Sequence, residues 1–207
     1  ADAFAAFADE LEKAKDIEAA ANKIIKRELK AHYRIIFNLD GYGPDWEPEA
    51  AKRGLLNNKN TADAVPVFFE KKNIDVFVRN GVYTEQEAVA RGEVALENYS
   101  KIINIEALTM LDMAKQDIIP ALSDYVAKLS ANLTTKKSAV SGAPSLAETT
   151  LITELATLND KLFTAVRKLE GDLANIDKDD VRAASKAMAH TIIPGMEDVR
   201  TVADEAE

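Results

Sequence analysis

Histidine and carboxylate side chains are the residues of this sequence that could hold a metal ion or move a proton. The chain carries two histidines, His32 and His190, and no cysteine, so disulfides, thiolate chemistry and cysteine-ligated zinc are excluded. A two-metal carboxylate site in a helical bundle needs glutamate three residues before histidine on two helices, with further glutamates from two others. Neither histidine has a glutamate at that spacing, although Glu28 lies four residues before His32 and shares its helix face. We therefore interpret both histidines as solvated or satisfied side chains and expect no metal ligand in this chain.

The motifs of nucleophilic catalysis and of phosphate binding are missing. No serine lies in a Gly-x-Ser-x-Gly elbow, and neither Gly-x-x-x-x-Gly-Lys-Ser/Thr nor Gly-x-Gly-x-x-Gly occurs. The stretch Asp40-Gly41-Tyr42-Gly43 has two glycines but not the spacing of a phosphate cradle, and it contains no basic residue. The sequence therefore predicts no catalytic residue and no cofactor-binding residue in this chain.

Glu106 is the carboxylate that the sequence singles out. It lies in the apolar stretch 102–111, with Asn104 and Asp112 nearby. A buried carboxylate must be paired or have a shifted pKa. Glu106 is then either an acid, base or ligand, or a structural carboxylate bonded to a lysine or a helix N-terminus across the bundle. We favour the structural role, which predicts that Glu106→Ala lowers thermal stability.

The net charge limits the classes of partner that the chain is expected to bind. The 207 residues carry a net charge of −9, which disfavours binding to nucleic acid and to anionic membranes. No apolar stretch reaches the length of a membrane span, and no signal peptide opens the chain. We expect a soluble, cytoplasmic protein. Because the chain begins at Ala1 without an initiator methionine, we also expect a piece of something longer or a chain trimmed of an expression tag.

Amphipathic helices must position these side chains, because apolar residues recur three or four apart through most of the sequence. The first half predicts a helix over about 2–33, a loop-rich segment over 38–60, a short helix from Thr61, and a long helix from the capping box Thr84–Glu87 to about 131. The second half predicts a kink at Ile118-Ile119 before Pro120, a loop over 138–144, a helix from a second capping box Ser145–Glu148, and a last helix capped by Asp177 or Asp179 and bent at Pro194-Gly195. The stretch 74–78 is the best strand candidate and is too short to build a sheet.

These elements predict an all-α fold, an antiparallel helical bundle with long, proline-kinked helices and a loop-rich segment in its first third. The centre of the long helix, residues 102–111, is apolar on more than one face, so we expect that helix to be surrounded by others. The segment 34–46 is best explained as a structural corner that turns on Gly41 and Gly43, where glycine permits positive φ, and buries Tyr42 or Trp46.

Three stretches resemble the late part of type III glutamine synthetases. They are RELKAHYRIIFN (27–38) followed by Gly41-Tyr42, AKRGLLN (51–57) followed by TADAVP (61–66), and ENYSKIINIEALTMLDMA (97–114) continuing to Ile118-Ile119-Pro120. They cover about residues 1–125 in the order of the family, whereas 145–207 match only as helices. Asn38-Leu39-Asp40-Gly41 departs from the family's usual Asn-Gly-Asn-Gly.

The resemblance implies a non-catalytic C-terminal part of a glutamate–ammonia ligase. The residues that bind ATP, Mg²⁺ or Mn²⁺ and glutamate belong, in this family, to a preceding catalytic barrel, so none is carried over, and the fragment alone is expected to be inactive. Residues 1–83 would join the catalytic part of the same chain, and 84–207 would form a C-terminal bundle. The full-length enzyme would form homo-oligomeric rings, with this region contributing packing and assembly.

Other interpretations stay open. A stand-alone helical interaction or regulatory protein would bind a partner through an exposed apolar groove. An independent bundle enzyme would need a metal or acid–base site that two histidines make hard to build. In the resemblance, the 38–46 loop has a further possible role at the edge of the parent's active site.

Overall fold

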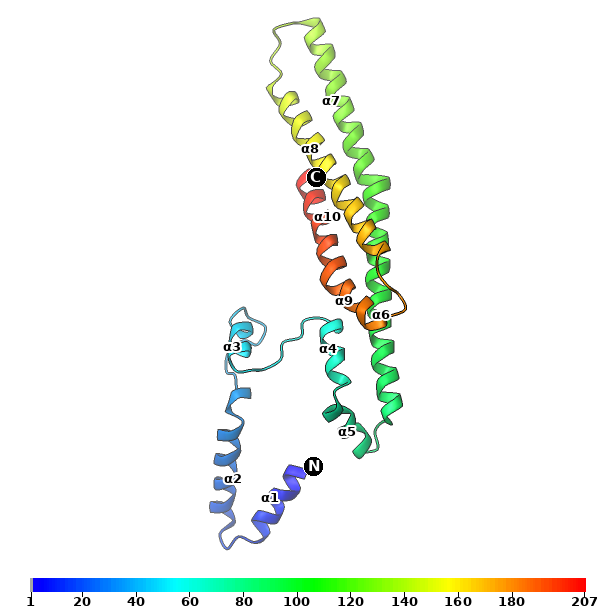
Figure 1. Cartoon of the computed structure of the whole chain (residues 1–207). Helices are drawn as coiled ribbons and strands as arrows, with labels where there is room; N and C mark the ends of the chain where they lie inside the picture. Colours follow the sequence, from blue (N-terminus) through cyan, green and yellow to red (C-terminus); the bar gives the residue numbers. More distant parts are fainter. Residues whose placement is uncertain (1) are drawn as a thin grey trace. The chain divides into compact units, whose positions relative to one another are not determined.

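The computed structural model describes residues 2–207, which form helices without a strand (Figure 1). The predicted all-α class is confirmed. The chain divides into two compact units, residues 1–57 and 58–207, and each is described by itself. The predicted division at residue 83 concerns a junction with a catalytic part and stays a prediction.

The first unit holds two helices joined by a turn, where the sequence predicted one helix over 2–33. Its elements are α1 (Asp2–Glu12), α2 (Ile17–Ala31), the 3₁₀ helix η1 (Tyr33–Ile35) and α3 (Trp46–Lys52). The single-helix prediction is wrong because α1 ends at Glu12 and a new helix, capped by Asp16, begins at Ile17. The Asp16 carboxylate accepts a hydrogen bond from the Ala19 amide at 3.0 Å, which satisfies one of the free N–H groups of the α2 N-terminus.

The second unit is built around one long helical rod. Its elements are α4 (Thr61–Phe68), α5 (Lys71–Arg79), α6 (Glu85–Met113), the π-helix η2 (Ala114–Ile118), α7 (Ile119–Ala139), α8 (Leu146–Ala174), α9 (Val181–Ala187), the π-helix η3 (Met188–Ile192) and α10 (Ile193–Ala206). The rod α6–η2–α7 runs without a break from Glu85 to Ala139. Figure 1 shows α8 returning along it and α9–α10 running back along α8.

The start of the rod confirms the first predicted capping box. The Thr84 hydroxyl accepts from the Glu87 amide at 3.2 Å, and the Glu87 carboxylate accepts from the Thr84 amide at 2.8 Å. The second predicted box is wrong. Ser145 precedes α8 but makes no side-chain cap, because Glu148 instead pairs with Lys136 of α7.

Both prolines that were expected to bend helices follow a π-helical turn. In each case the amide of the residue before proline bonds the carbonyl five residues earlier, Ile119 to Ala114 and Ile193 to Met188. A proline ring clashes with the carbonyl four residues back. We attribute the two wider turns to relief of that clash ahead of Pro120 and Pro194. The bend angles themselves stay a prediction.

The core of the second unit lies where the rod, α8 and α9–α10 meet. Its buried members are Ile103, Ala107, Leu111, Ala114 and Leu122 of the rod, Leu162, Val166, Leu169 and Leu173 of α8, and Met188, Ile192 and Val199 of the last helices. Leu162 and Leu169 are fully buried, and each such side chain contributes roughly 1.5–3 kcal/mol to folding. The apolar stripes predicted for α8 and the last helix therefore form the core.

Several local predictions need correction. Stretch 74–78, the strand candidate, is helical in α5. The caps of α4 and α9 are Asn60 and Asp180, each one residue before the helix, rather than Thr61 or the earlier aspartates. The loop predicted from 138 begins after Ala139. In residues 2–207, no helix combines the length and apolar character needed to cross a membrane.

Candidate functional site

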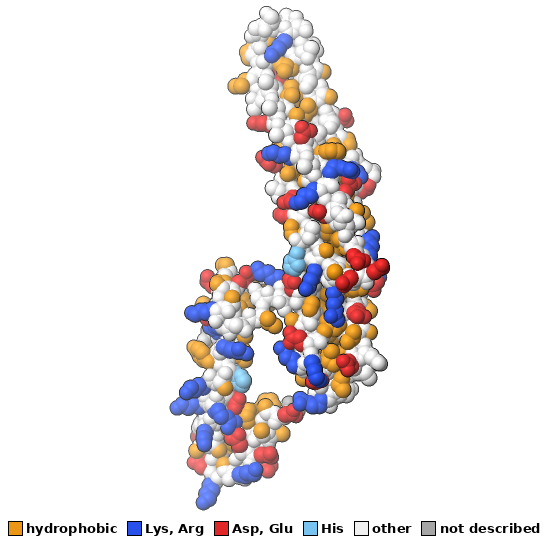
Figure 2. All heavy atoms as spheres, viewed as in Figure 1, with side chains coloured by type: hydrophobic (Ala, Val, Ile, Leu, Met, Phe, Trp, Pro, Cys, Tyr) orange, Lys and Arg blue, Asp and Glu red, His pale blue; other side chains and the backbone are white. Residues whose placement is uncertain are grey.

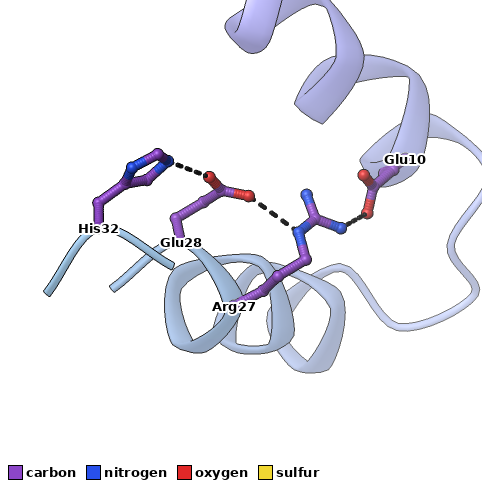
Figure 3. Close-up of polar contacts among 4 residues, drawn as sticks. All are labelled: Glu10, Arg27, Glu28 and His32. Carbon is purple, nitrogen blue, oxygen red and sulfur yellow. Dashed lines mark hydrogen bonds and ion pairs between the residues drawn. The ribbon is translucent and has the colours of Figure 1, made fainter. Parts of the chain in front are cut away.

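A chain of charged side chains links α1 to α2 (Figure 3). Arg27 of α2 donates from Nη1 to Glu10 Oε2 of α1 at 3.0 Å and from Nε to Glu28 Oε1 at 2.8 Å. The other Glu28 oxygen lies 3.5 Å from His32 Nε2, so the predicted contact between these two residues is confirmed. The Arg27 guanidinium also lies 5.8 Å from the ring centre of Phe7. This cluster joins the two helices by charge and by ring packing.

The electrostatics of this cluster suit structure better than catalysis. The hydrogen bond from Arg27 holds the pKa of Glu10 below its ordinary value, and the bonds to Glu10 and Glu28 raise the pKa of Arg27 further above its usual range. A guanidinium that never loses its proton cannot serve as a base, and a carboxylate held ionised is a poor acid. Sequence reasoning missed the Arg27–Glu10 pair because it joined the two helices into one.

His190 belongs to a second pair, which connects η3 to α4. Its Nε2 lies 2.9 Å from Asp63 Oδ1, while Asn60 donates to the other Asp63 oxygen at 2.7 Å and caps the same helix. The pKa of Asp63 is lowered, first by the bond from His190 and then by that from Asn60. Both histidines are thus paired with carboxylates, as expected for satisfied side chains.

No metal centre can be assembled from the part of the chain that the structure describes. Within residues 2–207, no three histidine, aspartate or glutamate side chains gather as ligands. The prediction that the chain contributes no catalytic residue is not tested by this geometry and stays a prediction.

Glu106 is not buried, so the argument that singled it out is wrong. Its side chain is exposed on α6, and Asp112 is also exposed, where it accepts from Gln116. Asn104 is half-buried. The stretch 102–111 is not surrounded either. It buries Ile103, Ala107 and Leu111, whereas Ile102, Ile105 and Leu108 face outward with 51–62% of each side chain exposed.

The side of α6 that faces away from the core carries exposed apolar side chains. We call Val94, Ile105 and Leu108, which are 53%, 62% and 51% exposed, the outer face of α6. These residues recur along one side of the helix opposite its core stripe. A second exposed stripe, Ile25 and Leu29 of α2 with Tyr33 after it, has four-residue spacing. Figure 2 shows apolar side chains lying uncovered among mixed charges on the visible face.

The sequence signal for this face is the stretch 102–111, which is apolar on more than one side and therefore predicts a helix surrounded by others. Apolar residues on more than one side of a helix mean that both sides are covered in the functional state. Only one side of α6 is covered by the described residues of this chain. Uncovered apolar patches of this kind are typical of interaction sites.

The 34–46 segment forms a corner in which Trp46, one of the two expected anchors, is half-buried and Tyr42 is not. Asp40 accepts from the Tyr42 amide at 2.9 Å, and Tyr42 is fully exposed. Trp46 packs on Phe37 with ring centres 4.7 Å apart, and the Arg53 guanidinium lies 5.7 Å from the Phe37 ring. Within residues 2–207 positive φ is found at Gly54 and Gly81, so the corner does not use it at its own glycines.

Comparisons with known proteins agree on one family. The model of the glutamine synthetase C-terminal domain matches residues 20–137. A glutamine synthetase of Butyrivibrio fibrisolvens is 34% identical over 199 residues, which is 93% of this chain and 28% of that protein. The type-3 glutamine synthetase of Dictyostelium discoideum and a glutamine synthetase of Bacteroides fragilis are each 28% identical over 92% of this chain.

The chain therefore spans 26–28% of the length of these relatives. All three stretches that resemble type III enzymes lie in full within the matched residues 20–137. The chain belongs to the glutamine synthetase C-terminal domain family.

Proposed function

We propose that this chain is the non-catalytic C-terminal part of a longer glutamine synthetase. The longer enzyme joins ammonia to glutamate by way of a γ-glutamyl phosphate, using ATP and Mg²⁺ or Mn²⁺. Support comes from the family match and from relatives that are named glutamine synthetases and are much longer than this chain.

The polar clusters of the described residues support a location for the ATP and metal site outside this chain. The polar clusters are salt-bridged pairs, and no set of three metal ligands gathers within residues 2–207. In this proposal the nucleotide, the metal and the reacting groups are held by the catalytic part of the enzyme, and we derive no catalytic step through this chain.

The outer face of α6 is the observation that carries the role in assembly. Large aliphatic side chains at Ile105 and Leu108 are more than half exposed, in the segment whose sequence most resembles the family. Burying such side chains is worth roughly 1.5–3 kcal/mol each, which a contact with the catalytic part would recover. We propose that this face packs against the catalytic part of the same chain.

The remaining residues of the chain have roles in the same proposal. Residues 1–83 form the junction with the catalytic part, with the exposed stripe of α2 as a second contact, and residues 84–207 form the C-terminal bundle. The full-length protein is proposed to be a cytoplasmic homo-oligomer, in which this region supports ring assembly.

The length of the native protein is the first test. An antibody raised against this chain should detect, in lysate of the source cells, a band far heavier than 22.6 kDa. That longer protein should make glutamine from glutamate, ammonia and ATP, and the isolated chain should not. A native band at 22.6 kDa would favour a stand-alone helical interaction or regulatory protein instead, and turnover by the isolated chain would refute a non-catalytic role.

Charge substitution on the outer face of α6 tests the docking role. Leu108→Asp in the longer protein should loosen the contact with the catalytic part of the same chain and so lower the melting temperature and the ligase activity of that protein. The matched control is Leu146→Asp, at a residue that is 83% exposed at the start of α8. In the isolated chain both variants should unfold at the temperature of the unchanged chain, which separates docking from folding. An unchanged melting temperature and ligase activity of the longer protein with Leu108→Asp would refute the proposed contact.

A further inference from the structure

The second unit contains an apolar groove that shares Ile105 with the outer face of α6 and is otherwise lined by other residues of that helix and of its neighbours. It has a volume of about 970 Å³ and lies between α10 on one side and the α6–η2–α7 rod on the other. Along α10 its lining extends from Met196 to Glu207, roughly 17 Å at 1.5 Å per helical residue. That length matches about three turns of a helix.

The floor of the groove is apolar and rich in methionine. Met110, Met113 and Met196 line it, which are three of the four methionines in the sequence. Met113 is 53% exposed, whereas Val199 and Leu122 beneath are buried. Methionine side chains are flexible and polarisable, so they are favoured on surfaces that accept apolar side chains of a partner helix.

The rim of the groove is acidic. Glu106, Asp117, Asp204 and Glu207 line it, against a single cation, Arg200. Arg200 Nε is already bonded to Asp204 at 2.6 Å, so its charge is compensated inside this chain. The remaining carboxylates on the α6–η2 side of the rim, Glu106 and Asp117, are both exposed. The groove therefore combines an apolar floor with a field of negative charge.

We propose that this groove binds a basic amphipathic helix presented by another protein. Apolar side chains of that helix, spaced at i, i+3, i+4 and i+7, enter the methionine-lined floor, and its lysines or arginines face the carboxylates of the rim. The charge on the rim steers association and selects a basic partner.

Other occupants fit the groove less well. A nucleotide, glutamate or an anionic membrane would bring negative charge to an acidic rim. A second copy of this chain would bring a net charge of −9 to the same rim. A permanent contact within one protein would be expected to be more hydrophobic overall than a groove edged by four carboxylates. An apolar floor with a charged rim is the pattern of a non-obligate interface, which suits a reversible partner.

The probe for the test is a synthetic peptide of about 18 residues, long enough to cross the groove. It carries leucine and methionine at i, i+3, i+4 and i+7 and lysine elsewhere. The 207-residue chain should bind it one-to-one, with a dissociation constant in roughly the micromolar range. Binding should weaken when salt is raised from roughly 50 mM to about 500 mM, because rim charges become screened. Titration calorimetry and fluorescence anisotropy measure both.

Substitutions locate the site. Asp117→Lys should weaken peptide binding about fivefold, as for the loss of an exposed ion pair and its reversal. Met113→Asp should weaken it about tenfold or more by placing a charge on the apolar floor. The matched controls are Asp124→Lys, on α7 away from the groove lining, and Leu108→Asp, on the outer face of α6. Both should bind the peptide like the unchanged chain.

Four outcomes would overturn the proposal. Three of them concern the peptide: no binding of the basic peptide, equal binding of a peptide with glutamate in place of lysine, and equal binding of a scrambled peptide. The fourth is self-association of the chain that Met113→Asp abolishes, which would assign the groove to a second copy. The Leu108→Asp control keeps this test separate from the packing role proposed above, since that role can fail while peptide binding persists.

Discussion

The hydroxyl of Tyr99 is a buried polar group in the second unit. Tyr99 lies on α6, packs against the core, and has a buried hydroxyl with no hydrogen-bond partner among residues 2–207. Burial raises the pKa of the Tyr99 hydroxyl, and the negative charges of Asp63 and Glu106 raise it further. A buried polar group without a partner costs roughly 1–3 kcal/mol. The hydroxyl is thus a destabilising group in the isolated chain.

We predict that Tyr99→Phe raises the free energy of unfolding by about 1 kcal/mol, because it removes the unpaired hydroxyl and keeps the ring. Urea unfolding followed by circular dichroism measures the change. The control is Glu106→Ala, which should stay within about 0.5 kcal/mol because Glu106 is exposed. A clear loss of stability in Tyr99→Phe would mean that the hydroxyl is bonded.

The pair between Asp63 and His190 predicts a pH dependence at the residue scale. Because the folded-state pKa of Asp63 is lowered, its contribution is present above its unfolded pKa of about 3.9 and is lost as pH falls through the folded value. Asp63→Asn should therefore melt below the unchanged chain at pH near 6, and the difference in Tm should shrink as pH falls toward about 2. Asp124→Asn, an exposed carboxylate on α7, is the control. A difference that stays constant with pH would contradict the assignment.

The packing of the end of α4 against α6 depends on the glycine at position 92. A Cβ added to Gly92 of α6 would lie 2.4 Å from the Phe69 ring, which follows α4 and lies 4.3 Å from the Arg182 guanidinium. The absence of a side chain at Gly92 therefore lets the end of α4 pack directly on the rod. Gly171, in the last turn of α8, has open space around its Cα.

These two glycines predict opposite effects of the same substitution. Gly171→Ala should stabilise the chain by about 0.5–1 kcal/mol, since alanine has the higher helix propensity and meets no obstacle. Gly92→Ala should destabilise it by about 1–3 kcal/mol, because the Phe69 ring must move. Thermal unfolding of both variants makes the comparison. Adding Phe69→Leu to Gly92→Ala should recover part of the loss, and no recovery would refute the contact as its cause.

At the scale of the whole molecule, the two units differ in how much core they have. In the described residues 2–57, Ile24 and Ala50 are buried, whereas the second unit buries a continuous cluster across the rod, α8 and α10. Burial of apolar surface is the main source of stability. The second unit should therefore resist unfolding more strongly than the first.

Limited proteolysis tests this difference. A dilute broad-specificity protease should remove the first unit and leave a resistant fragment that begins near residue 58, detected by mass spectrometry over time. Local opening governs cleavage, so segments with little buried surface are cut first. The Arg27→Gln variant, which removes the α1–α2 ion pair with Glu10 and the pair with Glu28 within α2, should be cut faster in the first unit and unchanged in the second. A resistant fragment that retains residues 2–57 would contradict the prediction.

The sequence by itself determined the class of the fold, the starts of α4, α6 and α8, and the family. The stripe of Leu158, Leu162 and Leu169 and the Thr84–Glu87 capping box are local patterns, and such patterns act within one or two helical turns. The break at Asp16 was missed because the apolar spacing continues through it, and only the packing of α1 on α2 shows the turn.

Only the tertiary structure decided which apolar residues are covered. Ile103 and Ile105 are two residues apart and equally apolar, yet one is 8% and the other 62% exposed. Their difference depends on which sides of α6 meet α8 and α10, and that is set by helices far along the chain. The same arrangement of helices leaves Glu106 on the surface, at the acidic rim of the groove. The floor of that groove holds Met110 and Met113 of α6 and Met196 of α10. Sequence spacing cannot show this, because a periodic pattern defines the faces of a helix but not the neighbours that cover them.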